Sequence, residues 1–105
     1  MIPSVHTKEQ VFDRVYSHRA TIRQFGAARL GLFGSFVRGQ QKEDSDVDLM
    51  VEFEAGKKTI HNLLDLADYL ESLLARKVDL LTWEGVAGFV QKYVATEIEY
   101  VALAD

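Results

Sequence analysis

The chain of 105 residues contains no cysteine, only one proline, and fewer basic than acidic residues. The lack of cysteine excludes disulfide bonds and metal sites made of thiolates, and it agrees with a cytoplasmic protein in a reducing compartment. Long apolar runs are also missing, so we expect neither a membrane span nor a secretory leader. Twelve Lys and Arg against sixteen Asp and Glu leave a formal charge of −4. Because a surface that holds a long nucleic acid is normally basic, this balance disfavours extended contact with DNA or RNA.

Apolar residues follow two different periods along the chain, and together they predict one domain over residues 1–105. A chain of this length forms one hydrophobic core but not two. Thr7 and Gln10 form a capping-box pattern, and Thr59 precedes a second segment with helical spacing. We expect helices over residues 8–25, 60–74 and 86–93, a helical turn over 36–39, and strands over 28–33, 45–53, 77–82 and 99–103. This order predicts an α/β (α+β) fold in which helices pack on a small mixed sheet of three to four strands.

The most informative motif is Gly34-Ser35 followed, after ten residues, by Asp46-Val47-Asp48. Two aspartates at positions i and i+2 of a strand point to the same face of a sheet. Bare charges about 4 Å apart repel by roughly 4 kcal/mol at an effective dielectric near 20. A divalent cation reverses the sign of that interaction, and Mg²⁺ typically binds one or two carboxylates together with phosphate oxygens. The pair Asp46 and Asp48 therefore predicts a magnesium site.

The Gly34-Ser35 pair predicts a phosphate site beside the metal. A strand that ends in glycine lets a phosphate approach the backbone closely, and the turn that follows offers N–H groups and the Ser35 hydroxyl to an anion. Asp79 lies in an otherwise apolar strand, where an unpaired buried acid would be costly. If that strand neighbours the strand of Asp46 and Asp48, Asp79 joins the cluster, where it binds a second metal ion or accepts a proton from an incoming hydroxyl. Such a set of groups suits attack on the phosphorus of a nucleotide.

The segments GSFVRG, DSDVDLMVEF and KVDLLT, taken together, resemble the polymerase-beta-type nucleotidyltransferases. They are most similar to the minimal branch of that superfamily, the MNT-domain antitoxins encoded beside HEPN-domain toxins. The resemblance covers the chain from about Val11 to Leu103. A chance Gly-Ser and Asp-x-Asp at one set spacing is expected in about one chain in a thousand of this length.

The resemblance implies the nucleotidyltransferase fold, with ATP as substrate and two Mg²⁺ ions as cofactors. It implies transfer of AMP to an acceptor hydroxyl with loss of pyrophosphate. In the antitoxin branch the acceptor is a tyrosine of the partner HEPN ribonuclease, which the modification inactivates. The family's phosphate-binding pair matches Gly34 and Ser35. Its acids match Asp46, Asp48 and Asp79, which are expected to be catalytic metal ligands, with the base role usually given to Asp79.

Arg38 matches a recurrent arginine after the Gly-Ser pair, which suggests contact with the nucleotide. The alternative is that Arg38 braces its loop through Glu43 or Asp44. Ser35 has an alternative role as a helix N-cap, a common position for serine. Asp79 has an alternative as an exposed acid on an edge strand.

Two other functions fit the same residues. One is a non-catalytic antitoxin that neutralises the toxin by complex formation alone, and the other is a nucleotidyltransferase that modifies a small molecule or an RNA end. Four aromatic residues near the C-terminus suit either ordinary packing or a surface that faces a partner, since interfaces favour Tyr and Trp. These residues are Trp83, Phe89, Tyr93 and Tyr100.

Overall fold

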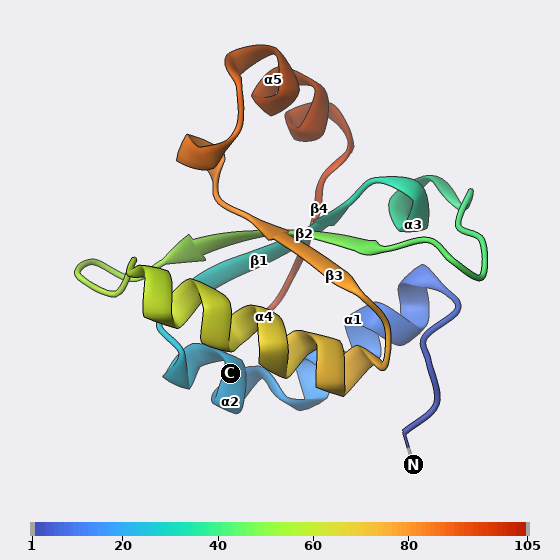
Figure 1. Cartoon of the computed structure of the whole chain (residues 1–105), viewed down its shortest axis with the longest axis horizontal. Coiled ribbons are helices and arrows are strands. Elements are labelled where there is room, and N and C mark those ends of the chain that lie inside the picture. Colours follow the sequence, from blue (N-terminus) through green and yellow to red (C-terminus); the bar gives the residue numbers. More distant parts are fainter. Residues whose placement is uncertain (1, 105) are drawn as a thin grey trace.

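The computed structural model describes residues 2–104, in which helices alternate with strands as predicted (Figure 1). In chain order the elements are α1 (Lys8–Ser17), α2 (Arg19–Gln24), β1 (Ala27–Phe33), α3 (Ser35–Arg38), β2 (Val47–Phe53), α4 (Ile60–Leu74), β3 (Val78–Leu81), the 3-10 helix η1 (Trp83–Gly85), α5 (Gly88–Glu97) and β4 (Glu99–Val101). The four strands form one mixed sheet. The predicted α/β fold with a small mixed sheet is therefore confirmed.

The sheet brings the predicted phosphate and metal motifs to one place. Its strand order is β3-β2-β1-β4, with β2 parallel to β3 and antiparallel to β1. β1 also pairs antiparallel with β4. Parallel neighbours require a crossover connection, which α4 provides between β2 and β3. Consequently the first residues of β2 and β3 lie beside each other, next to the last residues of β1.

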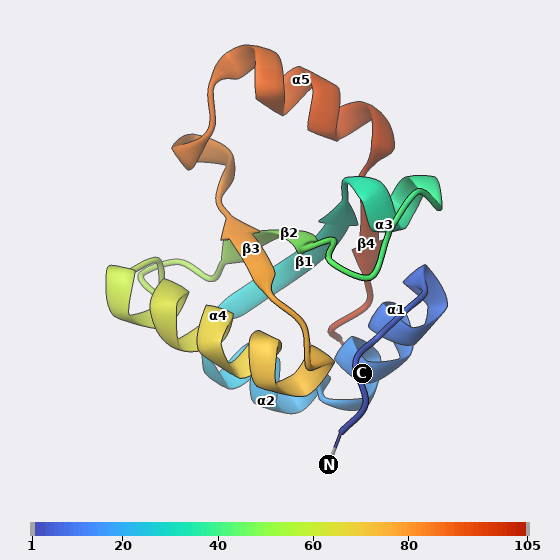
Figure 2. The same cartoon turned by 45° about the vertical axis from the view of Figure 1, so that its right-hand side comes forward.

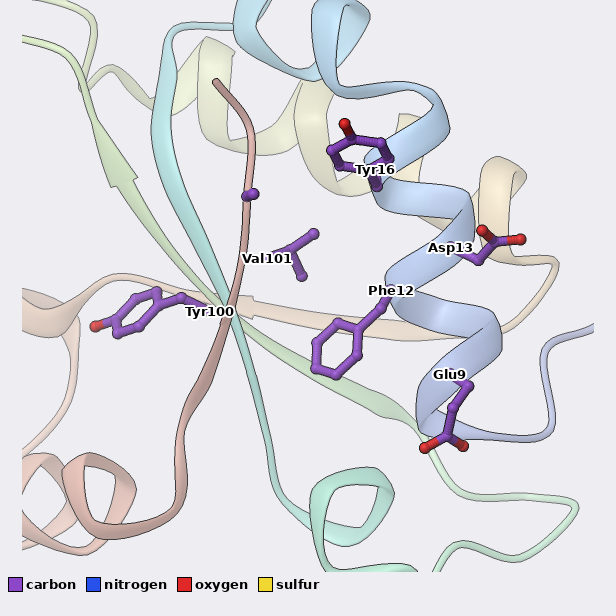
Figure 3. A pocket seen from close by; sticks show the side chains of 7 residues that line it. Glu9, Phe12, Asp13, Tyr16, Tyr100 and Val101 are labelled. Carbon is purple, nitrogen blue, oxygen red and sulfur yellow. The ribbon is translucent and has the colours of Figure 1, made fainter. Parts of the chain in front are cut away.

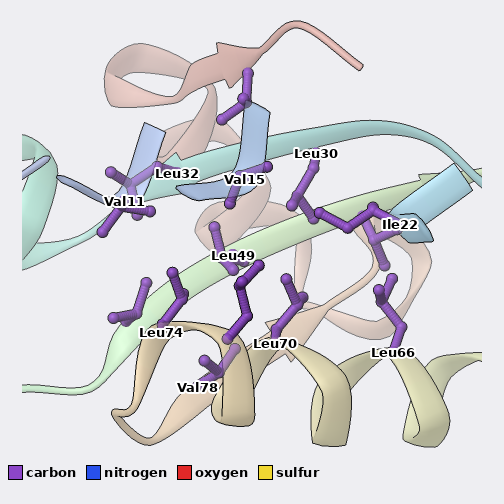
Figure 4. Packing of buried hydrophobic residues seen from close by; sticks show 14 of the residues in the cluster. Val11, Val15, Ile22, Leu30, Leu32, Leu49, Leu66, Leu70, Leu74 and Val78 are labelled. Carbon is purple, nitrogen blue, oxygen red and sulfur yellow. The ribbon is translucent and has the colours of Figure 1, made fainter. Parts of the chain in front are cut away.

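The main hydrophobic core lies between one face of the sheet and α1, α2 and α4 (Figures 1 and 2). Figure 4 shows Leu66, Leu70 and Leu74 of α4 turned toward the strands. From β2, Val47 and Leu49 are buried in the same core. The apolar side chains on one face of β2 thus pack against the apolar side chains on one face of α4, as their sequence patterns predict.

The opposite face of the sheet carries a smaller core and the acidic residues. Side chains alternate along a strand, so Asp48 and Met50 of β2 face away from α4. Met50 is buried there with Phe33 of β1 and Val94 of α5. η1 and α5 lie over this face (Figure 1). The acidic end of β2 is therefore beneath α5.

The predicted helix starts at Thr7 and Thr59 are confirmed. The Thr7 and Thr59 hydroxyls accept hydrogen bonds of 3.1 Å from the backbone N–H groups of Gln10 and Asn62. The Gln10 side chain accepts from the N–H of His6, one residue before the cap, rather than from that of Thr7. Within residues 2–104, no helix is both long and apolar enough to cross a membrane.

The prediction of a single helix over residues 8–25 is wrong, because the chain breaks at His18. His18 has φ −114° and ψ 21°, and its Nδ1 lies 2.9 Å from the carbonyl oxygen of Arg14. Val15 before the break and Ile22 after it both reach the core. The apolar spacing therefore continues through the break, and no glycine or proline marks it. The last helix also differs from the prediction, since it starts at Gly88 rather than at Val86.

We expect Leu70→Ala to lower the free energy of unfolding by about 3 kcal/mol, because Leu70 is fully buried and its truncation leaves a cavity. Leu64→Ala on the same helix is the matched control. Leu64 is 56% exposed, so its truncation should cost less than about 0.5 kcal/mol. Urea unfolding followed by circular dichroism measures both, and equal losses would contradict the burial pattern of α4.

Candidate active site

The three predicted acids come together where β2 and β3 begin. In the parallel pairing of these strands, Asp48 lies directly beside Asp79, and Phe33 of β1 is the neighbour of Asp48 on its other side. Asp46 precedes β2 by one residue and Asp48 by two. Asp46 and Asp48 are half-buried, whereas Asp79 is exposed on the edge strand β3, the position that its alternative predicts. The order of the strands therefore places next to each other two acids that are 31 positions apart in the sequence.

Asp48 carries the strongest electrostatic perturbation of the three acids. Its pKa is raised from 3.8 to about 6, first by burial and then by the negative charges of Asp79 and Asp46. The positive charge of Arg38 opposes this rise. A half-buried carboxylate beside two others is unfavourable in isolation, because each ionised group destabilises its neighbours. A cation at this position would remove the cost.

Gly34 is required by the close approach of Asp48. Gly34 has φ +80° and ψ −153°, a backbone conformation almost confined to glycine. A Cβ atom at this position would lie 2.1 Å from Oδ2 of Asp48. The end of β1 and the metal motif of β2 are thus in direct contact.

Ser35 begins α3 and does not cap it, so the alternative of an N-cap role for Ser35 is wrong. Gly34 holds the cap position, and no side-chain hydrogen bond caps this helix. The turn into α3 needs the positive φ of Gly34 at the cap position itself, so Ser35 becomes the first residue of the helix. Ser35 is half-buried beside Gly34.

Arg38 is held by α5 and by Gln40 of its own loop, whose Oε1 accepts from Arg38 Nε at 3.0 Å. The alternative of bracing through Glu43 or Asp44 is therefore wrong. Its Nη1 donates to Oε1 of Glu97 at 2.9 Å and to the Tyr93 hydroxyl at 3.1 Å. The pKa of Arg38 is raised, chiefly by its hydrogen bond to Glu97. α5 returns over the sheet face that bears Asp48, and this long-range packing supplies the partners.

Arg76 holds the loop instead, a role that the sequence does not indicate. Its Nη1 donates to the carbonyl oxygens of Lys42, Glu43 and Ser45 at 3.0, 3.0 and 2.9 Å. Its Nε donates to the carbonyl oxygen of Val5 at 3.0 Å. Arg76 lies just before β3, so one side chain ties the start of β3 to the segment that leads into Asp46.

Glu97 is a second residue of the site that the sequence analysis missed. Its Oε2 accepts a hydrogen bond of 2.6 Å from the N–H of Gly34, and the carboxylate also accepts from Arg38. Glu97 ends α5, far along the chain from the Gly-Ser motif, in a segment whose helical pattern is interrupted by glycine. No local signal in the sequence distinguishes it from a solvated glutamate.

The acidic side chains suit a metal ion that binds together with a ligand. In the part of the chain that the structure describes, no three His, Asp or Glu side chains stand close enough to hold a metal ion by themselves. Mg²⁺ is usually bound by only one or two carboxylates, with phosphate oxygens and waters completing its shell. Asp46 and Asp48 provide such a partial set, and the negative charges of Asp46 and Asp79 around the half-buried Asp48 would be offset by a cation. The donor set therefore fits Mg²⁺ that arrives with a phosphate.

The four aromatic residues near the C-terminus divide into two pairs. Trp83 and Tyr100 both donate hydrogen bonds to Oε2 of Glu52, at 3.0 and 3.1 Å. Phe89 and Tyr93 on α5 are 79% and 56% exposed. Tyr100 is 38% exposed in spite of its hydrogen bond, and Phe89 and Tyr93 are the aromatic residues that lie exposed on α5.

A cavity of about 430 Å³ lies apart from the acidic site, between α1 and β4 (Figure 3). Phe12, Tyr16 and Tyr100 line it together with Glu9 and Asp13. None of the three aspartates of the site contributes to its lining. The cavity therefore plays no part in the chemistry of the acidic cluster.

Comparisons with known proteins show which family this chain resembles. Residues 16–101 match the family model described as the nucleotidyltransferase domain. The protein adenylyltransferase MntA of Thermococcus cleftensis is 38% identical over 96 residues, which cover 90% of this chain and 96% of that protein. The match thus spans nearly the full length of both chains.

Two solved structures share the fold. A protein assigned as a minimal nucleotidyltransferase superimposes with a TM-score of 0.79 and 34% identity, covering 92% of this chain and 98% of the other. A complex of a tri-AMPylated HEPN toxin from Shewanella oneidensis with an MNT antitoxin matches with a TM-score of 0.61 and 20% identity. The latter match covers 88% of this chain and 69% of the other chain, and it shows a shared fold.

We expect Gly34→Ala to lower the free energy of unfolding by about 3 kcal/mol or more, because it adds backbone strain and displaces Asp48. Gly39→Ala is the matched control. Gly39 also has a positive φ, of 70°, but a Cβ atom there meets nothing within 4 Å, so only about 1 kcal/mol should be lost. Urea unfolding compares the two variants, and equal losses would argue against close contact between Gly34 and Asp48.

We expect Asp48→Asn to stabilise the metal-free protein at pH 7.5. The pKa of Asp48 is higher in the folded state than in the unfolded one, so its contribution favours folding below about pH 4 and is lost as the pH rises through about 6. After allowance for solvent screening of a half-buried group, the gain should be about 1–2 kcal/mol. Asp68→Asn, at an exposed position of α4, is the control. Unfolding measured from pH 4 to 8 tests this, and parallel profiles of wild type and Asp48→Asn would contradict it.

Proposed function

The chain belongs to the nucleotidyltransferase domain family, and from this premise we propose that it is a Mg²⁺-dependent protein adenylyltransferase that acts as an antitoxin. It transfers AMP from ATP to a tyrosine hydroxyl of a partner HEPN ribonuclease and thereby inactivates that toxin. The observation that carries the proposal is the contact between the two motifs: Gly34 lies against Asp48, and Asp48 lies beside Asp79. The similarity to a named protein adenylyltransferase over nearly the whole chain supports the same conclusion.

Asp46 and Asp48 would hold Mg²⁺, with Asp79 as a further ligand on the neighbouring strand. When bound, Mg²⁺ would neutralise phosphate charge and make the α-phosphorus more electrophilic. The half-buried position of Asp48 strengthens this interaction, because charges attract more strongly away from bulk water. The family resemblance supports two ions at this site.

Gly34, Ser35 and Arg38 bind and orient the triphosphate. The N–H of Gly34 and the hydroxyl of Ser35 donate to phosphate oxygens, and the guanidinium of Arg38 adds a charged donor. These groups come from the end of β1 and from α3, which the contact with Asp48 fixes relative to the acids. The protein therefore positions the α-phosphorus next to the carboxylates.

Asp79 accepts the proton of the acceptor tyrosine. As the tyrosine oxygen forms a bond to the α-phosphorus, the bond from that phosphorus to the bridging oxygen of the β-phosphate breaks. Pyrophosphate leaves, and the tyrosine proton moves to a carboxylate oxygen of Asp79. Asp79 suits this role because its side chain is exposed, so a hydroxyl of another protein can reach it.

The surroundings of the site favour a protein as acceptor. Tyr93 and Phe89 are exposed on α5, and the Tyr93 hydroxyl contacts Arg38 at the edge of the site. Exposed aromatic residues are typical of protein interfaces. The net charge of −4 disfavours RNA or DNA as acceptor. A partner protein bound at α5 would bring its tyrosine toward Asp79.

We expect the double variant Asp46→Asn, Asp48→Asn to abolish AMP transfer, with a loss of at least about a thousandfold, because it removes the carboxylates that bind Mg²⁺. The assay incubates the protein with ATP labelled on its α-phosphate and with the HEPN-domain protein encoded beside it. Asp44→Asn is the matched control, since Asp44 lies in the same loop but is exposed and outside the cluster. Label transfer that survives the double variant would refute the assignment.

The same assay separates the two other functions. If the double variant still protects cells from the toxin and its complex is equally stable, neutralisation depends on binding alone. If labelled AMP appears on RNA or on a small molecule without any protein acceptor, the substrate class is different. Mass spectrometry of the toxin identifies the modified residue, and a tyrosine is expected.

A further inference from the structure

Glu97, the last residue of α5, is an acidic side chain at the site to which the proposed reaction gives no role. Its carboxylate accepts hydrogen bonds from the Gly34 N–H, at 2.6 Å to Oε2, and from Arg38 Nη1, at 2.9 Å to Oε1 and 3.2 Å to Oε2. The side chain is only 13% exposed. Glu97 is therefore an anion already bound to two of the donors assigned to the triphosphate.

The position of Glu97 is not explained by the stability of its own helix. A negative charge at the C-terminal end of a helix is repelled by the helix dipole. The neighbouring carboxylate of Asp48 carries the same sign of charge and repels that of Glu97. The hydrogen bonds from Gly34 and Arg38 offset these costs. The charge is thus held in place by the donors of the phosphate site.

Resting on the proposed function, we infer that Glu97 is an internal competitor for the β- and γ-phosphates of ATP. Carboxylate and phosphate oxygens accept hydrogen bonds from the same backbone N–H and guanidinium donors. The single N–H of Gly34 cannot donate fully to both at once. Nucleotide binding therefore requires the Glu97 carboxylate to leave Gly34 and Arg38, and this requirement weakens binding.

The attachment of α5 allows Glu97 to leave. Val94 is the buried side chain of α5, and it packs in the small core with Phe33 and Met50. Segments with few buried contacts open at a lower free energy than the rest of a fold. Figure 2 shows the end of α5 descending beside α3, so a small shift there or a rotation of the side chain would free the donors.

Competition of this kind lowers the apparent affinity by the fraction of molecules in which the donors are free. If Glu97 occupies them in about nine molecules of ten, its removal tightens binding about tenfold, or about 1.4 kcal/mol. We expect Glu97→Gln to bind AMP-PNP with Mg²⁺ about tenfold more tightly than wild type, measured by isothermal titration calorimetry. The Gly34 amide proton should also move upfield in the NMR spectrum of the ligand-free variant, because it loses a charged acceptor.

Two further variants separate occupancy from charge. Glu97→Asp keeps the charge but shortens the side chain, so it should also bind AMP-PNP more tightly than wild type if direct occupation of the donors is the cause. Glu84→Gln makes the same change in net charge at an exposed residue that pairs with Lys58, and its affinity should equal that of wild type.

Several results would overturn the inference. Weaker binding by Glu97→Gln would show that Glu97 positions Arg38 for the nucleotide. If Glu97→Asp binds AMP-PNP with the affinity of wild type, the effect of Glu97 would come from charge repulsion and not from occupation of the donors. In both cases the proposed function survives, provided that wild-type binding depends on Asp46 and Asp48. Absence of AMP-PNP binding in both wild type and Glu97→Gln would overturn the inference and the proposed function together.

Discussion

The contact between Gly34 and Asp48 is the constraint on which the rest of the site depends. Oδ2 of the half-buried Asp48 lies only 2.1 Å from where a Cβ atom of residue 34 would be, so the end of β1 packs directly against the start of β2. The result is electrostatically unfavourable by itself, since Asp48 is also beside Asp79. A fold selected only for stability would not keep three acids together in this way, because each raises the energy of the next. Under the proposed function, a bound cation together with an anionic ligand would make the arrangement favourable.

The two faces of the sheet differ in what they carry: one bears the main hydrophobic core, and the other bears the acidic residues. One face is closed by α1, α2 and α4 over a continuous apolar core. The other carries the acids and is covered by η1 and α5 over a small core. Because β2 alternates, Leu49 serves the first face and Asp48 the second. The layer of α1, α2 and α4 therefore positions the carboxylates without contacting them from the other face.

Two arginine side chains connect segments around the site that are far apart in the sequence. Arg76 joins the loop before Asp46 to the start of β3 through backbone carbonyl groups. Arg38 joins α3 to α5 through Glu97 and Tyr93. Guanidinium groups suit this task because one planar group donates several hydrogen bonds at once. The two arginines consequently connect the loop before β2 and the helix α3 to distant parts of the chain.

The amino-acid sequence by itself determined the alternation of helices and strands, the helix caps at Thr7 and Thr59, and the identity of the Gly-Ser and Asp-x-Asp motifs. These features are local, because they depend on residue spacing within one element or one turn. Only the tertiary structure decided three other features. It placed Asp79 beside Asp48, and it made glycine necessary at position 34. It also brought Glu97 into hydrogen bonds with Gly34 and Arg38. Each of these depends on strand order or on the return of α5 over the sheet, and contacts between segments so far apart leave no periodic trace in the chain. The break at His18 was hidden for a related reason, since the core accepts Val15 and Ile22 on both sides of it and the apolar spacing is unchanged.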